Sequence, residues 1–221
     1  MKKIITFLLL ITSTTMAQDK GVFESYSNSF YGKIVRESKT YDQIDNASDK
    51  SFKMYLDDKE IPGSIEEFII VASEEPISQG NTGTCWCFST ISFYESEIQR
   101  ITGKRINLSE LYPVYFEYIE KAREYINTRG KSHLGEGSET NAVQRMMKIY
   151  GIVPLEAYTG KPSNQPYHNH EKMFSEINTY LRNCKETNFW DEQVIIANIK
   201  SILDYYMGAL LMLKMQMIFC L

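Results

Sequence analysis

The most informative segment of this chain is Gln79–Ser89, which reads QGNTGTCWCFS. It places Cys85 six residues after a glutamine and directly after a loop that contains two glycines. Apolar residues then recur at alternating spacings of four and three, which predicts a helix from Cys85 to a stop at Gly103. The first turn of a helix carries unsatisfied N–H groups and the positive end of the helix dipole, and both stabilise a thiolate. The segment therefore predicts that Cys85 is a nucleophile.

Helical periodicity separates Cys85 from the neighbouring Cys87. At about 100° per residue, the two side chains point about 200° apart, so we expect them neither to pair nor to bind one metal ion. Cys85 shares a face of small polar residues with Ser89, Ser92 and Ser96. Cys87 is predicted to be a small core residue. It begins an apolar stripe that is expected to face the core: Cys87, Ile91, Tyr94, Ile98 and Ile101.

A cysteine nucleophile also needs partners for the charges that it creates. The oxyanion formed by attack on a carbonyl needs fixed donors, which the Cys85 N–H and the Gln79 side-chain amide can supply. The thiol further needs a base, normally a histidine. The three histidines of the chain, His133, His168 and His170, stand in polar, loop-like contexts, so we expect solvated loop residues instead of a base. His168 and His170 also lack a third ligand for a metal site.

The remaining periodicity predicts a mainly helical chain. Amphipathic helices are expected from Ser109 as N-cap to about residue 128, and over residues 139–150, 171–184 and 190–207. The apolar run Phe68–Val71 is expected to be a short strand or a buried extended segment. Residues 18–60 are polar, and are interpreted as an irregular N-terminal extension or, alternatively, as poorly patterned strands.

Composition limits the classes of function. A length of 221 residues suffices for one sizeable core, and a net charge of −4 offers no large basic surface for nucleic acid. Lys2 and Lys3, the apolar run at 4–11 and the small residues at 15–17 are typical of a signal peptide cut between Ala17 and Gln18. We therefore expect an exported protein, periplasmic or secreted, with no membrane anchor after cleavage.

Residues Gln79–Ser89 resemble the active-site signature of papain-like cysteine peptidases. The resemblance implies that Cys85 attacks the peptide, that Gln79 helps to bind the oxyanion, and that Glu136, Gly137 and Ser138 form the substrate-binding loop. Asn107–Glu110 resembles the start of the second helix of that family. Tyr150–Pro154 and Ala157-Tyr158 resemble the turn that follows the substrate loop in that family. The long insertions and the sequence of Tyr150–Pro154 are most similar to the bleomycin hydrolase and aminopeptidase C branch.

Three departures accompany this resemblance. Thr82 stands where many members have a disulfide cysteine, so that bridge is expected to be absent. Glu136 replaces the first glycine of the substrate loop. The largest departure is that the catalytic histidine and asparagine, expected at about 215–235 or later, do not occur. After Ala209 the likeness gives way to an apolar, methionine-rich tail, which we interpret as the result of a frameshift.

The resemblance implies an α+β papain-like fold, of which mainly the helical N-terminal half is present and the β-rich half is missing. The expected order is a signal peptide at 1–17, an extension at 18–60, the helical half at 61–208 and the tail at 209–221. Helix faces that the missing half would cover are expected to be exposed, which favours oligomerisation.

The predicted function is hydrolysis of peptide bonds through a thioester on Cys85. The resemblance implies this activity for the family, and we expect it to be weak or absent in this chain. The predicted partner is a peptide or protein, with no cofactor and no metal. Two alternatives stay open: a non-catalytic remnant that acts as a binding module, and another cysteine acyl-transfer enzyme such as an amidase or a transglutaminase.

Overall fold

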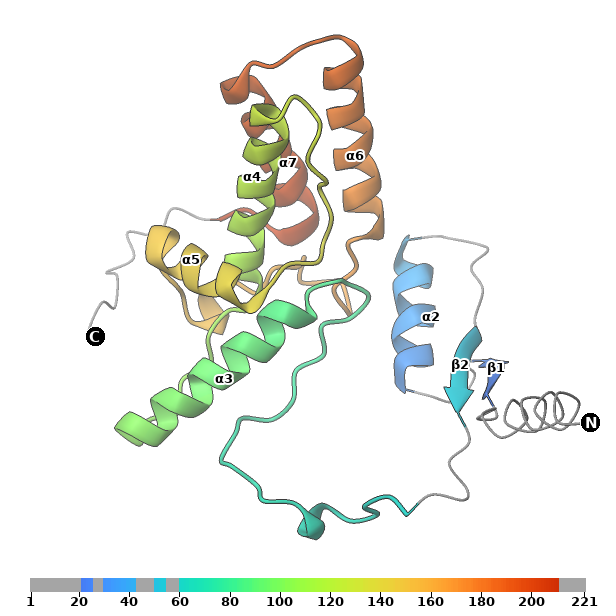
Figure 1. Cartoon of the computed structure of the whole chain (residues 1–221), viewed down its shortest axis with the longest axis vertical. Coiled ribbons are helices and arrows are strands. Elements are labelled where there is room, and N and C mark those ends of the chain that lie inside the picture. Colours follow the sequence, from blue (N-terminus) through green and yellow to red (C-terminus); the bar gives the residue numbers. More distant parts are fainter. Residues whose placement is uncertain (1–20, 26–29, 43–49, 55–59, 211–221) are drawn as a thin grey trace, which may run out of the picture. The chain divides into compact units, whose positions relative to one another are not determined.

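The computed structural model describes residues 21–25, 30–42, 50–54 and 60–210 (Figure 1). The predicted signal peptide and most of the apolar tail lie outside these residues. The described residues divide into two compact units. The smaller unit takes those from the ranges 1–33 and 44–69, and the larger unit those from 34–43 and 70–221.

The smaller unit contains a two-stranded antiparallel sheet. Strand β1 (Gly21–Ser25) pairs with β2 (Lys50–Met54) in a register that sets Val22 opposite Lys53 and Phe23 opposite Phe52. The Phe23 and Phe52 rings meet edge to face at 5.5 Å, which is a favourable cross-strand pair. Helix α2 (Phe30–Asp42) follows β1, so an irregular extension is the wrong description of the described residues between 18 and 60.

A short helical turn, η1 (Ile65–Glu67), follows the sheet and is closed by a capping box. The Ser64 side chain accepts a hydrogen bond from the Glu66 N–H, and the Glu67 carboxylate accepts one from the Ser64 N–H at 3.0 Å. The next four residues, Phe68–Val71, form no strand, and their side chains are 58–97% exposed. The expectation of a strand or a buried segment there is wrong, because no described residue covers this apolar run.

The larger unit contains every helix that periodicity predicted beyond residue 80. All five have bounds within two residues of the expected ones, and the first four are α3 (Cys85–Thr102), α4 (Leu111–Asn127), α5 (Thr140–Tyr150) and α6 (Glu171–Glu186). Helix α7 (Glu192–Met207) begins after Asp191, whose carboxylate accepts a hydrogen bond from the Val194 N–H. Helix α3 ends at Gly103 in the left-handed conformation that favours glycine, as predicted.

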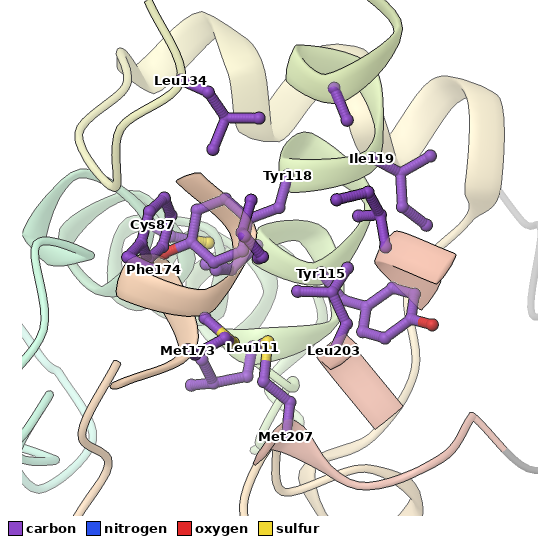
Figure 2. Packing of buried hydrophobic residues seen from close by; sticks show 14 of the residues in the cluster. Cys87, Leu111, Tyr115, Tyr118, Ile119, Leu134, Met173, Phe174, Leu203 and Met207 are labelled. Atoms are coloured by element: carbon purple, nitrogen blue, oxygen red, sulfur yellow. The ribbon is translucent and has the colours of Figure 1, made fainter. Parts of the chain in front are cut away.

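Helix α4 forms the centre of this unit. It packs against α7, α5 and α3, while α6 packs on the far side of α7 (Figure 1). Its buried side chains Leu111, Tyr115, Tyr118 and Ile119 meet Met173 and Phe174 of α6 and Leu203 and Met207 of α7 in one continuous core (Figure 2). Every labelled side chain in Figure 2 is at most 7% exposed. Burying such side chains stabilises a fold by about 1.5–3 kcal/mol each.

The core stripe predicted for α3 is present only in the first half of that helix. Cys87 and Ile91 are fully buried, and Tyr94 and Ile98 pack against the core from its edge. Ile101 is 60% exposed, so the prediction is wrong at that position. The cause is that α3 extends past α4 and α5, which leaves its last turn without a neighbour among the described residues (Figure 1).

The described part of the chain is thus mostly helical with one small sheet, which is consistent with the α+β class. Among these residues, none of the helices has both the length and the apolar character that crossing a bilayer requires.

Candidate active site

Cys85 is the first residue of α3 and is exposed to solvent. Cys87, two residues later, is fully buried, and its thiol donates a hydrogen bond to the main-chain oxygen of Glu110 at 3.0 Å. Burial and the nearby carboxylates of Glu110 and Glu117 raise the pKa of Cys87 well above its usual value. The two cysteines are free and point to different environments, which confirms the predicted separation between an accessible thiol and a core thiol.

The loop before Cys85 is closed by hydrogen bonds between its own residues. The Gln79 side-chain nitrogen donates to the Thr82 main-chain oxygen at 2.6 Å, and the Thr82 hydroxyl donates back to the Gln79 main-chain oxygen at 2.9 Å. The hydroxyls of Thr82 and Thr84 are 2.5 Å apart. A side-chain amide has two N–H donors. Gln79 therefore keeps one donor beyond the bond that closes the loop.

One side of this loop is fixed by residues 168–170, which precede α6. The Asn81 N–H donates to the His168 main-chain oxygen at 2.8 Å, and the His170 N–H donates to the Asn81 oxygen at 3.4 Å. The side chains of Asn81 and Asn169 are also hydrogen-bonded, at 3.0 Å. At Gly80, with φ of 68°, an added Cβ would lie 2.3 Å from the His168 oxygen. Glycine is required there by both conformation and space.

The other side of the loop is fixed by Glu136. Its carboxylate accepts a hydrogen bond from the Gly83 N–H at 2.6 Å, and its main-chain oxygen accepts one from the indole N–H of Trp86 at 3.1 Å. Gly83 and Trp86 flank Cys85 and its neighbour Thr84, which is fully buried. Glu136 therefore holds the backbone before the candidate nucleophile and the Trp86 side chain directly after it.

The predicted substrate loop, Gly135–Ser138, is anchored on α4. Lys121 donates to the main-chain oxygens of Gly135, at 2.8 Å, and of Gly137. The Ser138 hydroxyl donates to Glu117 at 2.8 Å, and Glu117 also accepts from Arg145 at 2.6 Å. Gly137 itself is exposed. Binding of substrate by Glu136, Gly137 and Ser138 stays a prediction; in the structure, the Glu136 and Ser138 side chains hold the loop in place.

Two of the three histidines are not the solvated residues that the sequence suggested. His170 is 1% exposed and His168 is 9% exposed, and only His133 lies at the surface. The reason is that residues 168–170 run beside the cysteine loop as a short parallel bridge, a contact between segments far apart in the sequence. Burial, with the charges of His170 and Lys161, lowers the pKa of His168 to about 3. Within the described residues, no hydrogen bond joins a histidine to Cys85.

His170 lies in a buried polar cluster that the sequence did not reveal. Its Nδ1 is 3.2 Å from the Tyr118 hydroxyl and 3.7 Å from the Glu136 carboxylate. Tyr118 counts as an apolar core residue by helical periodicity, and nothing in its spacing signals a polar partner. The sequence holds a weak indication that Glu117 is buried and has polar partners, because this acidic residue lies between the buried Val114 and Tyr118 on the apolar face of α4. Nothing in the sequence indicates that Lys121, on the same helix, holds the Glu136 loop.

Metal chemistry has no visible site in this region. Among the described residues, no group of three or more His, Cys, Asp or Glu side chains is placed to hold a metal ion. What the arrangement offers is an exposed thiol at a helix start, a nearby amide donor and a rigid backbone between them.

The sequence was also compared with models of known families. The model described as papain family cysteine protease matches residues 71–210, which is more than half of the chain. The match includes the cysteine loop, the Glu136 loop and all five helices from α3 to α7. The chain belongs to the papain family of cysteine proteases.

Proposed function

We propose that Cys85 is the nucleophile of a thiol peptidase site in which Gln79 assists. The observation that carries the proposal is the exposed Cys85 at the first turn of α3, directly after a loop that is closed by Gln79. The substrate is a peptide or protein, as the family implies.

In the proposed reaction, the Cys85 thiolate attacks the carbonyl carbon of the scissile peptide bond. The carbonyl oxygen takes up the negative charge and accepts hydrogen bonds from the Cys85 N–H and from the second N–H of Gln79. The C–N bond then breaks, the amine leaves with a proton from the protonated base, and a thioester remains on Cys85. Water, deprotonated by the same base, hydrolyses the thioester and regenerates the thiolate.

The base is not assigned to any of the three histidines. His168 and His170 are buried, and neither they nor His133 bonds to Cys85 within the described residues. We therefore propose that the chain as it stands hydrolyses peptides slowly or not at all, although it holds the nucleophile and oxyanion donors. The sequence of Tyr150–Pro154 supports an assignment to the bleomycin hydrolase and aminopeptidase C branch, and hence a preference for peptides with a free N-terminus.

An affinity label tests the site without requiring turnover. A peptidyl epoxide directed at thiol peptidases is expected to alkylate Cys85 selectively, and mass spectrometry after digestion locates the adduct. Cys87 and Cys184 are buried and serve as internal controls for unfolding. Cys85→Ser is expected to abolish labelling. Labelling spread equally over all cysteines, or absent from Cys85, contradicts a thiol peptidase site and favours a non-catalytic binding module.

Two refinements follow from the same reagent and the same chain. Epoxides with a free N-terminus should label Cys85 faster than acetylated ones if the aminopeptidase assignment is right. We also propose that the protein is exported after cleavage between Ala17 and Gln18. N-terminal sequencing of the protein recovered outside the cytoplasm tests this, and a chain that begins at residue 1 contradicts it.

A further inference from the structure

Glu136 makes two hydrogen bonds that bracket Cys85 in the chain. The carboxylate accepts a hydrogen bond from the Gly83 N–H at 2.6 Å, and the main-chain oxygen accepts one from the Trp86 indole N–H at 3.1 Å. The approach is close, because a Cβ added at Gly83 would lie 2.8 Å from the Glu136 Cβ. The backbone that carries the Cys85 N–H is therefore held from one residue on a different loop.

The Glu136 carboxylate itself lies beside a buried histidine. His170 Nδ1 lies 3.7 Å from it and 3.2 Å from the Tyr118 hydroxyl, and both His170 and Tyr118 are 1% exposed. Burial alone raises the pKa of Glu136, but the hydrogen bonds from His170 and from the Gly83 N–H, with the charge of His170, bring it below its usual value. The carboxylate is therefore ionised at neutral pH, and a charged acceptor gives a stronger hydrogen bond to Gly83.

His170 reaches the same loop by a second route. Its main-chain N–H donates to the Asn81 oxygen at 3.4 Å, so the residue that steadies Glu136 also touches the opposite end of the cysteine loop. The loop is thus fixed between Glu136 and the segment containing His170, with no covalent bond to either.

We propose that Glu136, supported by His170, is a positioning residue that sets the backbone geometry of Cys85. This rests on the proposed function, in which the Cys85 N–H must point at the developing oxyanion. Glu136 does not contact the substrate in this role, which differs from the substrate-binding role expected from the family resemblance.

The expected effect on chemistry is large, because reactions at a positioned group are sensitive to small displacements. A misplacement of 1 Å can slow a reaction about 100-fold. Glu136→Ala removes the acceptor for the Gly83 N–H and is expected to slow the maximal rate of Cys85 alkylation by the peptidyl epoxide by about 10- to 100-fold. Glu136→Gln keeps the size of the side chain and one oxygen acceptor, and is expected to recover much of that loss.

Trp86 provides a spectroscopic reading that does not depend on the thiol. The sequence contains only two tryptophans, Trp86 and Trp190, so Trp190→Phe leaves Trp86 as the only tryptophan, which can be excited selectively over tyrosine. Trp86 is 6% exposed, and acrylamide should quench it poorly. In the full-length Trp190→Phe background, Glu136→Ala should shift the emission to the red and raise the quenching constant severalfold, while Glu136→Gln should stay near the parent.

Matched variants separate positioning from general destabilisation. Glu97→Gln removes a glutamate of α3 that is paired at the surface with Arg100, and it should change neither reading. His133→Gln is the surface control for His170→Gln. Because breaking a buried pair leaves one charge without a partner, a single variant can fail to fold. The double variant Glu136→Gln/His170→Gln leaves no unpaired charge, and it should label Cys85 more slowly than Glu136→Gln alone.

The outcomes are distinct. Slower labelling together with exposed Trp86 in folded Glu136→Ala, and recovery in Glu136→Gln, support the proposal. Unchanged labelling and unchanged quenching in folded Glu136→Ala overturn it, as does a loss of thermal stability with no change in either reading. If the parent protein is not labelled at Cys85, the proposed peptidase site has failed, and Trp86 quenching alone then decides whether Glu136 holds the loop.

Discussion

Acid should destabilise this protein through His168, and the size of the effect follows from its burial. The pKa of His168 falls from an ordinary 6.5 to about 3 in the folded chain. Between pH 7.5 and pH 5 the unfolded chain takes up most of a proton at this residue and the folded chain takes up almost none. Linkage converts that difference into a loss of about 2 kcal/mol in the free energy of unfolding.

Glu110 acts in the opposite direction over the same pH range. It is 4% exposed, and burial raises its pKa from 4.5 to about 7, opposed by a hydrogen bond from its own backbone and reinforced by the charge of Glu95. The folded chain therefore binds a proton at Glu110 before the unfolded chain does, which adds about 2 kcal/mol of stability on acidification. The two residues nearly cancel, so the net acid response of the unaltered protein reveals neither.

Variants at each position separate the two effects. Urea unfolding at pH 7.5 and pH 5 should show that acidification lowers the free energy of unfolding of His168→Gln by about 2 kcal/mol less than that of the unaltered protein. Glu110→Gln should lose about 2 kcal/mol more. His133→Gln, at the surface, should match the unaltered protein. Equal acid losses in His168→Gln and the unaltered protein would show that His168 is accessible to protons and that the burial argument is wrong.

Two further substitutions test the contacts that fix the site, beside the labelling and fluorescence experiments described above. Gly80→Ala places a Cβ 2.3 Å from the His168 oxygen at a φ of 68°, and should lower the free energy of unfolding by about 2 kcal/mol or more. The control Gly63→Ala, where nothing lies within 4 Å of the added Cβ, should not lower it, and equal losses would show that Gly80 is not packed against His168. Glu117→Gln weakens the bonds from Ser138 and Arg145 to a buried carboxylate and should lower the free energy of unfolding in urea by about 1–3 kcal/mol. The surface control Glu97→Gln should change it much less, because exposed ion pairs contribute little; equal effects would contradict a stabilising role of the Glu117 contacts.

The helices could be predicted because their signal is local. Each of the helices α3 to α7 carries an apolar stripe that recurs over several turns, and α3, α5 and α7 are each followed directly by a glycine. Such a pattern depends on residues three or four positions apart, which one sequence shows completely. Cys85 could be proposed as a nucleophile for a similar reason, since Gln79 and Cys85 lie in one short segment.

The supporting residues of the site could not be predicted because their contacts are long-range. Asn81 meets Asn169 across 88 positions, and Gly83 meets Glu136 across 53. A histidine in a polar loop is normally solvated, and the burial of His170 depends on two loops meeting in space. Sequence periodicity carries no information about which loops meet, so the burial of His168 and His170 could not be predicted.

The same distinction explains where the site should be vulnerable. The apolar core around α4 sets the positions of the helices and includes Trp86 and Cys87, but it includes no residue of the loop before Cys85. That backbone is held by polar contacts from Glu136, His168 and His170, and at Thr82 by hydroxyl bonds. A polar contact of this kind is lost with a single charge or proton, whereas a well-packed core tolerates one conservative change. Conservative core substitutions in α7 should therefore lower stability and leave the labelling of Cys85 intact, while Glu136→Ala should impair labelling at little cost in helix content.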